Sequence, residues 1–429
     1  MEKTLIRNGL IITMATEKPS TMRCDILIEG SVIAKIGENI SDDDVTKTID
    51  ASDKVVIPGL VNCHNHAAMA LLRGYCDDLR LMEWLKKKIW PAEERMNGDD
   101  VYWGTMLAAA EMIKSGTTTF ADMYFFMDEV AAAVENSGIR ASLSRALAFT
   151  DDRANQRIEE TYRLFKNWRG KADGRITTMV GPHAPYTCSP DKLQLTRELA
   201  RELDSAIHIH LAETTEEVKR IFDKYGKSPT RYLADLGIFD SHVLLAHAVH
   251  LSPEDIQLLG SIKGGISHNP VSNQKLGCGV APVVDLIKHD ITVALGTDGP
   301  ASALTLDMFE EMKAAAWLQK NSQFDPTAIN AYQVLRMATI EGAKVLGLEK
   351  EVGTIEVGKK ADLIIVDIWK PHLCPHHDIC ALLAYSANGG DVESTIINGR
   401  IVMENRRLVG INEDEVMRKA HECAKRIMA

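Results

Sequence analysis

Two histidines, two residues apart, close an apolar run near the start of the chain. The run 55–61 is followed by Asn62 and Cys63, and then by His64 and His66 around Asn65. Because residues two apart on a strand face the same side, both imidazoles should converge on one point. Imidazole nitrogens are ligands for divalent metals, so we expect a metal site at this strand end rather than a hydrophobic core.

Later apolar runs also end in histidine or aspartate. Any one of these residues is explained more simply as a hydrogen-bonded core or loop residue. Six of the eight strands expected below end in His or Asp, however, and that set favours a shared site. His208, one pleat deeper than His210, and His250 are expected only to fill space. The residues at the later strand ends are His183, His210, His247, His268 and Asp298.

The elements that must position these residues alternate between apolar strands and helical stretches. This alternation predicts parallel β/α units, and eight strands predict an α/β fold of the (β/α)₈ TIM-like barrel type. A doubly wound open sheet is the structural alternative, since its ligand site also lies at the carboxyl ends of strands. The expected strands are 55–63, 117–123, 140–147, 176–182, 206–211, 242–246, 264–267 and 291–296, with helices over 101–114, 191–203 and 304–320.

Both ends of the chain have a different pattern from the middle. Residues 1–56 alternate polar and apolar side chains in short bursts punctuated by glycine, as in antiparallel hairpins, and short strands return at 353–358, 361–367, 392–398 and 400–404. We therefore predict one small β-sandwich built from both ends. Its parts would be residues 1–56 and residues 349–429 with a terminal helix, flanking a metal-dependent catalytic barrel over 57–348.

Composition excludes several classes of protein. The chain has 429 residues, 45% hydrophobic and 25% charged, which is ordinary for a globular protein. Its net charge of -11 argues against nucleic acid as a partner. No apolar run reaches the roughly 20 residues that span a membrane, and the start lacks the plan of a signal peptide. Eight irregularly spaced cysteines indicate reduced thiols and a cytoplasmic location.

Taken together, these motifs resemble the amidohydrolase superfamily over nearly the whole chain. The first-strand motif is 58–66, and later motifs are 210–214, 267–270, 296–299 and 358–363. Within the superfamily, the chain is similar to the 5'-methylthioadenosine/S-adenosylhomocysteine deaminases. The segments that carry this closer resemblance are 72–74, 83–85, 90–95, 181–186 and 275–283.

The resemblance implies a mononuclear metal centre. One divalent ion, zinc in preference to Fe²⁺ or Mn²⁺, would be held by His64, His66, His210 and Asp298, with a water completing its coordination. The reaction would replace the amino group at C6 of an adenine ring with oxygen. Glu213 would carry the protons to ring N1 and to the leaving ammonia, while His247 and Asp298 orient the water. From sequence alone, Glu213 could also be a helix-capping acid.

The resemblance also implies a nucleoside pocket. Glu93 would accept hydrogen bonds from ribose hydroxyls, and His183 would hold the ribose and purine. Arg145 and Arg157 would pair with the amino-acid carboxylate of S-adenosylhomocysteine, for which guanidinium geometry is suited. Ser302 follows Asp298 at the family spacing, but Ala303-Leu304 replaces an Asn pair frequent in this branch.

The sequence is also compatible with other functions. Adenosine, 5'-deoxyadenosine, guanine, a pterin or a chlorotriazine could be the substrate of the same fold. A non-catalytic barrel that binds partners is a more distant possibility, and the complete ligand set argues against it. We expect a homo-oligomer, as is common for cytoplasmic enzymes of this kind.

Overall fold

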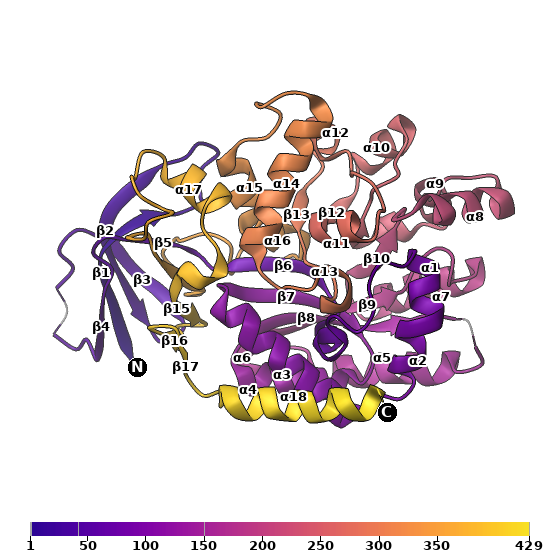
Figure 1. Ribbon diagram of the computed structural model, residues 1–429, viewed down its shortest axis with the longest axis horizontal. Helices are drawn as coiled ribbons and strands as arrows, with labels where there is room; N and C mark the ends of the chain where they lie inside the picture. The colour runs from indigo at the N-terminus through magenta and orange to yellow at the C-terminus, as the bar shows by residue number, and fades with distance from the viewer. Residues whose placement is uncertain (1, 42, 150, 429) are drawn as a thin grey trace.

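Eight parallel strands form the centre of the molecule. The computed structural model describes residues 2–41, 43–149 and 151–428. The strands follow one another around the sheet in chain order, and the first and last are neighbours in space, so the sheet is a nearly closed barrel (Figure 1). The predicted barrel is therefore confirmed, and the open sheet is not. The strands are β6 (Leu60–Asn65), β7 (Thr117–Tyr124), β8 (Arg140–Leu147), β9 (Ile176–Pro182), β10 (Ile207–Leu211), β11 (His242–His247), β12 (Lys263–His268) and β13 (Val293–Leu295).

The first barrel strand is shorter than the sequence suggests. The run expected as one strand over 55–63 is two strands in two sheets, separated by Gly59. The backbone N–H of Gly59 donates to the carbonyl of Asp362, and a Cβ there would lie 2.1 Å from the side chain of Thr118. Only glycine fits this close approach. The chain therefore passes from one sheet to the other at Gly59, although the residues on both sides of it are apolar.

Strands from both chain ends form a second, mostly antiparallel sheet. β5 pairs with β14, which joins the two ends in one nine-stranded sheet beside the barrel (Figure 1) and confirms that both ends of the chain build one β unit. Its own core contains Ile6, Ile26, Val56 and Ile365. The strands are β1 (Lys3–Ile12), β2 (Thr21–Glu29), β3 (Val32–Gly37), β4 (Lys47–Asp50), β5 (Lys54–Pro58), β14 (Leu363–Asp367), β15 (Val392–Ile397), β16 (Arg400–Glu404) and β17 (Arg407–Leu408).

Helices surround the barrel and cover the apolar outer face of its strands (Figure 1). They are α1 (Leu81–Trp84), α2 (Trp90–Glu93), α3 (Gly98–Lys114), α4 (Met127–Ser137), α5 (Ala154–Trp168), α6 (Lys171–Gly174), α7 (Pro190–Glu202), α8 (Thr215–Tyr225), α9 (Pro229–Asp235), α10 (Pro253–Leu259), α11 (Pro270–Lys275), α12 (Val283–Lys288), α13 (Pro300–Ala303), α14 (Met308–Gln323), α15 (Ala331–Met337), α16 (Ile340–Val345), α17 (Ile379–Tyr385) and α18 (Glu413–Met428).

Two local expectations are wrong. The helix expected over 304–320 begins only at Met308, because Leu304 has a left-handed φ of 72° and Asp307 caps α14 by accepting from the N–H of Phe309. The segment 353–358 forms turns rather than a strand. Gly353 and Gly358 both have φ near +90°, which ordinary strand geometry excludes.

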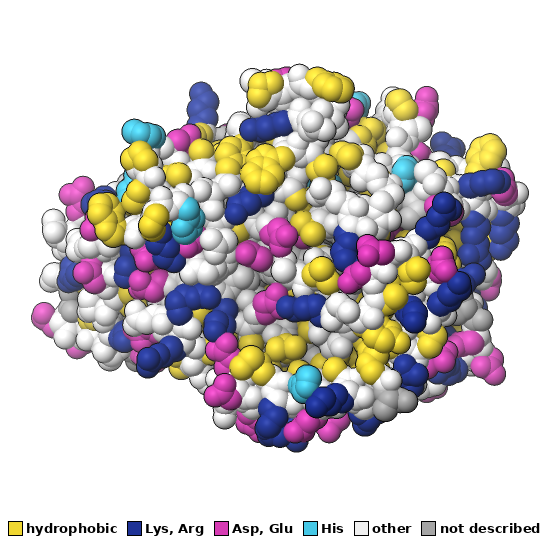
Figure 2. Space-filling view, in the orientation of Figure 1, with side chains coloured by type: hydrophobic (Ala, Val, Ile, Leu, Met, Phe, Trp, Pro, Cys, Tyr) yellow, Lys and Arg dark blue, Asp and Glu magenta, His cyan; other side chains and the backbone are white. Residues whose placement is uncertain are grey.

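The terminal helix α18 lies along α3 (Figure 1). An ion pair closes each end of this contact, Lys114 with Glu413 at 2.6 Å and Asp100 with Arg426. Across the residues that the structure describes, every helix is too short or too polar to cross a membrane. Acidic and basic side chains are interspersed on the face in Figure 2.

Candidate metal centre

The carboxyl ends of β6, β10 and β11 bring four histidines together. His64 lies in the middle, with its ring centroid 4.8 Å from those of His66 and His210 and 5.3 Å from that of His247. His64 is completely buried. Imidazoles packed this closely are costly unless something shared lies between them, since each would otherwise hide a polar nitrogen from water.

Hydrogen bonds orient all four rings in the same way. In each ring Nδ1 is already bonded, which leaves Nε2 available for another partner. The main-chain acceptors fix the tautomer, because a carbonyl can only accept and Nδ1 must then carry the proton. Such outer contacts are typical of histidines that bind metals. The Nδ1 partners are His208 Nε2 for His64 (2.8 Å), the Met123 carbonyl for His66 (2.6 Å), the His183 carbonyl for His210 (2.6 Å) and Asn273 Oδ1 for His247 (2.9 Å).

Asp298, just beyond β13, supplies a carboxylate to the same point. Its Oδ1 lies 3.5 Å from His64 Nε2 and 3.3 Å from His66 Nε2. Ser272 and Ser302 donate hydrogen bonds to its Oδ2 at 2.6 and 2.8 Å. Burial raises the pKa of Asp298, but the close approach of His64 and the electrostatic effect of His66 and His247 outweigh it and hold the pKa well below its usual range. The group is therefore a carboxylate at neutral pH.

Backbone strain is concentrated at these strand ends. Ala212, His247, Ala248 and Asp298 all have φ between 48° and 75°, a region that non-glycine residues rarely adopt. Such conformations cost about 1–3 kcal/mol each and persist where the surrounding structure enforces them, which is typical of functional sites.

The arrangement fits a divalent metal. Within the described chain, the ligand atoms of His64, His66 and Asp298 lie within 4.8 Å of one another, as do those of His64, His210 and His247. The Nε2 of His64 is fully buried and has no hydrogen-bond partner among the described residues, as expected for a nitrogen reserved for a metal. Three imidazoles and one carboxylate form a donor set that zinc, iron and manganese accept.

Glu213 lies at the edge of this centre. Its Oε1 is 3.9 Å from His247 Nδ1, and it accepts a weak bond from the Cys278 thiol at 3.7 Å. Burial raises the pKa of Glu213, while the neighbouring charge of His247 opposes the rise. The capping interpretation is wrong for this residue, since Thr214 is the N-cap of α8 and bonds the N–H of Glu217.

Glu93 and His183 both lie beside the histidine cluster. Glu93 accepts a 2.7 Å hydrogen bond from Tyr124, whose ring centroid is 6.3 Å from that of His66. Burial raises the pKa of Glu93 to about 7 against the opposing effect of that bond. The ring of His183 lies 4.8 Å from that of His210, and burial lowers its pKa to about 4. His183 is therefore neutral at physiological pH.

Arg145 and Arg157 are bonded to carboxylates of the chain itself. Arg145 donates to Glu160 at 2.6 Å, and Arg157 forms a bidentate pair with Asp151 at 2.6 and 2.7 Å. Both guanidiniums are already paired as they would be with a substrate carboxylate. A bound amino-acid group would have to displace or share these partners.

Sequence reasoning missed several residues around the centre. His208, interpreted as barrel filling, bonds His64. Tyr124 bonds Glu93, and Ser272 bonds Asp298. Glu217 accepts from the backbone N–H groups of Ala212 and Glu213, which holds the loop that carries Glu213. The alternation His208-Ile209-His210 was the one available signal, because it puts both rings on the same face of β10.

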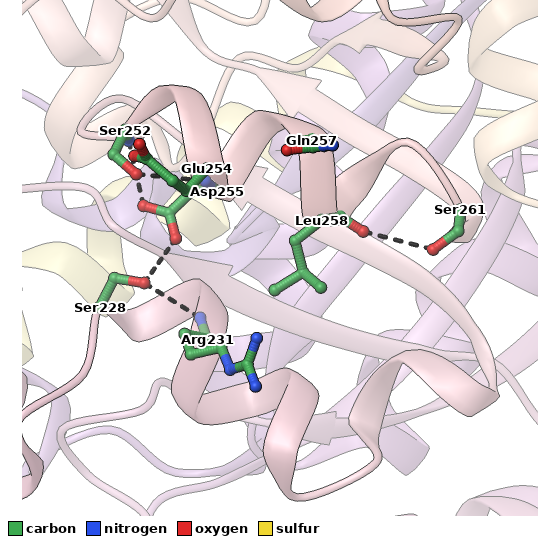
Figure 3. Close-up of a pocket in the computed structure, with 8 residues that line it drawn as sticks. All are labelled: Ser228, Arg231, Ser252, Glu254, Asp255, Gln257, Leu258 and Ser261. Carbon is green, nitrogen blue, oxygen red and sulfur yellow. Dashed lines mark hydrogen bonds between the residues drawn. The ribbon is translucent and has the colours of Figure 1, made fainter.

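A separate surface hollow of about 440 Å³ lies between α9 and α10 (Figure 3). Its polar groups are used for helix capping. Ser228 accepts from the N–H of Arg231, and Ser252 and Asp255 form a reciprocal capping box. The hollow therefore has a structural explanation and is distinct from the metal centre.

Comparison with known proteins agrees with this geometry. A model of the amidohydrolase family matches residues 55–402, which is most of the chain. The chain belongs to the amidohydrolase family. Amidohydrolases are hydrolases that use a divalent metal, so the coarse expectation of a metal-dependent enzyme is confirmed, and the non-catalytic alternative is not supported.

Individual amidohydrolases match almost end to end. A 5-methylthioadenosine/S-adenosylhomocysteine deaminase of Thermoanaerobacter pseudethanolicus is 49% identical over 99% of both chains. A 5'-deoxyadenosine deaminase of Methanosarcina acetivorans is 48% identical over 100% of this chain and 99% of its own. The crystal structure of an adenosine deaminase from Xanthomonas campestris with bound zinc superposes with a TM-score of 0.94, at 33% identity over 99% of this chain and 98% of that one.

Proposed function

We propose that this amidohydrolase deaminates the adenine ring of 5'-methylthioadenosine and S-adenosylhomocysteine, giving the inosine analogues and ammonia. Adenosine and 5'-deoxyadenosine are further candidate substrates. The observation that carries this proposal is the convergence of His64, His66, His210, His247 and Asp298, with the buried Glu213 beside His247. The relatives described above, which are deaminases of such nucleosides, support the choice of substrate.

The ligand residues would be His64, His66, His210 and Asp298, and the zinc in the Xanthomonas relative supports zinc over Fe²⁺ or Mn²⁺. A bound divalent ion would lower the pKa of a water at this centre. His247 and Asp298 would orient a water against C6 of the purine. Glu213, whose raised pKa allows it to be protonated, gives its proton to N1 as the water oxygen bonds to C6. One water proton then passes through Glu213 to the amino group, the C6–N bond breaks and ammonia leaves, and the other water proton restores the protonated Glu213.

Four further residues would bind the nucleoside. Glu93 accepts from the ribose hydroxyls, and the neutral His183 contacts the ribose and purine. Ser302 borders the substrate while it holds Asp298. Arg145 and Arg157 take the amino-acid carboxylate of S-adenosylhomocysteine in exchange for Glu160 and Asp151.

A nucleoside panel tests the proposal. The zinc-loaded enzyme should cause loss of adenine absorbance with 5'-methylthioadenosine and S-adenosylhomocysteine, and the rates with adenosine and 5'-deoxyadenosine should be compared. Arg157→Ala should lower kcat/KM for S-adenosylhomocysteine by about 10–100-fold, since it removes a charge-assisted contact. The same variant should change turnover of the uncharged methylthio nucleoside little, which serves as the internal control. If the metal-loaded enzyme deaminates none of these adenosine derivatives, the adenine proposal is wrong. The substrate would then be sought among guanine, pterins and chlorotriazines.

The pKa of Glu93 gives a test by pH. Because burial raises this pKa to about 7, the carboxyl is neutral below that pH and charged above it. A carboxylate accepts ribose hydrogen bonds better than a neutral acid, so kcat/KM for 5'-methylthioadenosine should fall by up to about tenfold per pH unit below 7. Glu93→Gln should weaken binding and remove this component of the profile. A profile unchanged by Glu93→Gln would remove Glu93 from the ribose site.

We also propose a cytoplasmic homo-oligomer. All eight cysteines are free, which supports a reducing compartment. Trp317 and Trp369 are 55% and 74% exposed, and exposed aromatic side chains of this kind are enriched at subunit interfaces.

A further inference from the structure

His208 occupies a buried position between a ligand histidine and a serine. It lies on β10 with no exposed surface, and its ring centroid is 5.0 Å from that of His64. Its Nε2 is 2.8 Å from His64 Nδ1, and its Nδ1 is 3.1 Å from Ser144 Oγ on β8. Both nitrogens of His208 are therefore bonded to specific partners, which packing alone does not require.

The direction of these hydrogen bonds follows from the carbonyl of Asp122, which is the last acceptor of the bonds that run from His64 through His208 and Ser144. Ser144 Oγ is 2.8 Å from the carbonyl of Asp122, and a carbonyl can only accept, so the serine proton points there. Ser144 Oγ must then accept from His208 Nδ1–H. This leaves the lone pair of His208 on Nε2, where it accepts from His64 Nδ1–H.

The remaining lone pair of His64 is consequently on Nε2. That atom is buried, has no hydrogen-bond partner among the described residues, and lies 3.5 Å from Asp298 Oδ1. The other three histidines of the centre are oriented by backbone carbonyls or an amide. His64 alone among them depends on another titratable ring for its tautomer.

We propose that His208, held by Ser144, is a positioning residue that fixes the tautomer and ring orientation of His64 for metal binding. This inference rests on the proposed metal centre and not on the identity of the nucleoside. Outer partners of ligand histidines typically contribute about 10–100-fold to metal affinity.

Metal affinity of matched variants tests this proposal. His208→Leu keeps the approximate volume and removes the acceptor, whereas His208→Gln can place Oε1 where Nε2 lies. The dissociation constants for Zn²⁺ and Co²⁺ are measured against a competing chelator, and the visible spectrum of the Co²⁺ form reports the coordination geometry. Leucine should weaken binding about 10–100-fold and change the spectrum, and glutamine should restore affinity to within about threefold.

His242→Leu is the matched control, because His242 bonds the Val345 carbonyl at the opposite end of β11 from His247. It should leave metal affinity unchanged. If His208→Leu does not fold, Ser144→Ala can be used instead. It removes the oxygen that accepts from His208 Nδ1–H, and it should also weaken metal binding. Unchanged affinity and spectrum in either variant, or equal losses for leucine and glutamine, would overturn the proposal. Turnover is assayed separately, so a wrong nucleoside assignment would not affect these results.

Discussion

Replacing Glu213 with glutamine should lower nucleoside deamination by about 10²–10⁴-fold, the usual contribution of a general acid–base residue. The amide keeps the size and the neutral charge of the protonated acid, but it cannot carry protons to N1 and the leaving amine. Because Glu213 is not in the proposed ligand set, zinc should remain bound at about one ion per chain. Steady-state rates with 5'-methylthioadenosine and metal analysis of the same preparation check both statements.

Glu217→Gln is an informative companion to this variant. It retains an acceptor oxygen for only one of the two backbone N–H groups, those of Ala212 and Glu213, that bond separate oxygens of Glu217, and it loses the charge. We expect a smaller loss of rate than for Glu213→Gln, since Glu217 acts through the loop. Substantial residual turnover in Glu213→Gln would exclude Glu213 as the proton carrier, and loss of zinc would indicate that it acts as a ligand instead.

Replacing Asp298 with asparagine should remove both metal and activity. The substitution exchanges a carboxylate of strongly lowered pKa for a neutral amide at the point where His64 and His66 converge. Zinc affinity should fall by more than about 100-fold, beyond the effect of an outer-shell partner. Turnover should fall by at least about 10³-fold, because water activation depends on the ion. Zinc content after dialysis at fixed free zinc, and rates at saturating zinc, measure the two effects.

Asp255→Asn provides the control for this experiment. Asp255 is a buried carboxylate that forms the capping box of α10 with Ser252 and is not among the residues grouped at the metal centre. Its replacement should lower thermal stability without altering zinc content. An Asp298→Asn enzyme that retained zinc and wild-type turnover would show that the carboxylate is neither ligand nor orienting group.

The barrel and the positions of its polar strand ends could be predicted from sequence because both depend on local patterns. Apolar runs alternating with helices predict parallel strands, and the ends of parallel strands gather at one edge. The shared strand-end position of His64, His66, His210 and Asp298 follows from that rule, as does that of His183, His247 and His268. Family resemblance added what the pattern alone could not, namely which of these residues would hold the metal, the reaction and the role of Glu213.

The orienting contacts could not be predicted, because they join residues far apart in the chain. His208 forms a hydrogen bond with His64, which lies 144 residues earlier in the sequence, and Tyr124 forms one with Glu93, which lies 31 residues earlier. The break at Gly59 was also hidden, since the strands on either side are equally apolar and only the contact with Thr118 distinguishes them. The pairing of Arg157 with Asp151 depends on side-chain positions that no periodicity encodes.

The pairing of β5 with β14 has a consequence for biosynthesis. Lys54 pairs with Asp367, so β5 is finished early in translation while its partner emerges some three hundred residues later. Until then β5 has an unpaired hydrogen-bonding edge, which is open to non-native association. The next strand, β6, carries His64 and leads directly to His66, which are two of the proposed metal ligands. We therefore expect ribosome-bound chains that lack β14 to need chaperone protection. We also expect the yield of folded enzyme on expression to depend more on this order of synthesis than on the stability of the finished fold.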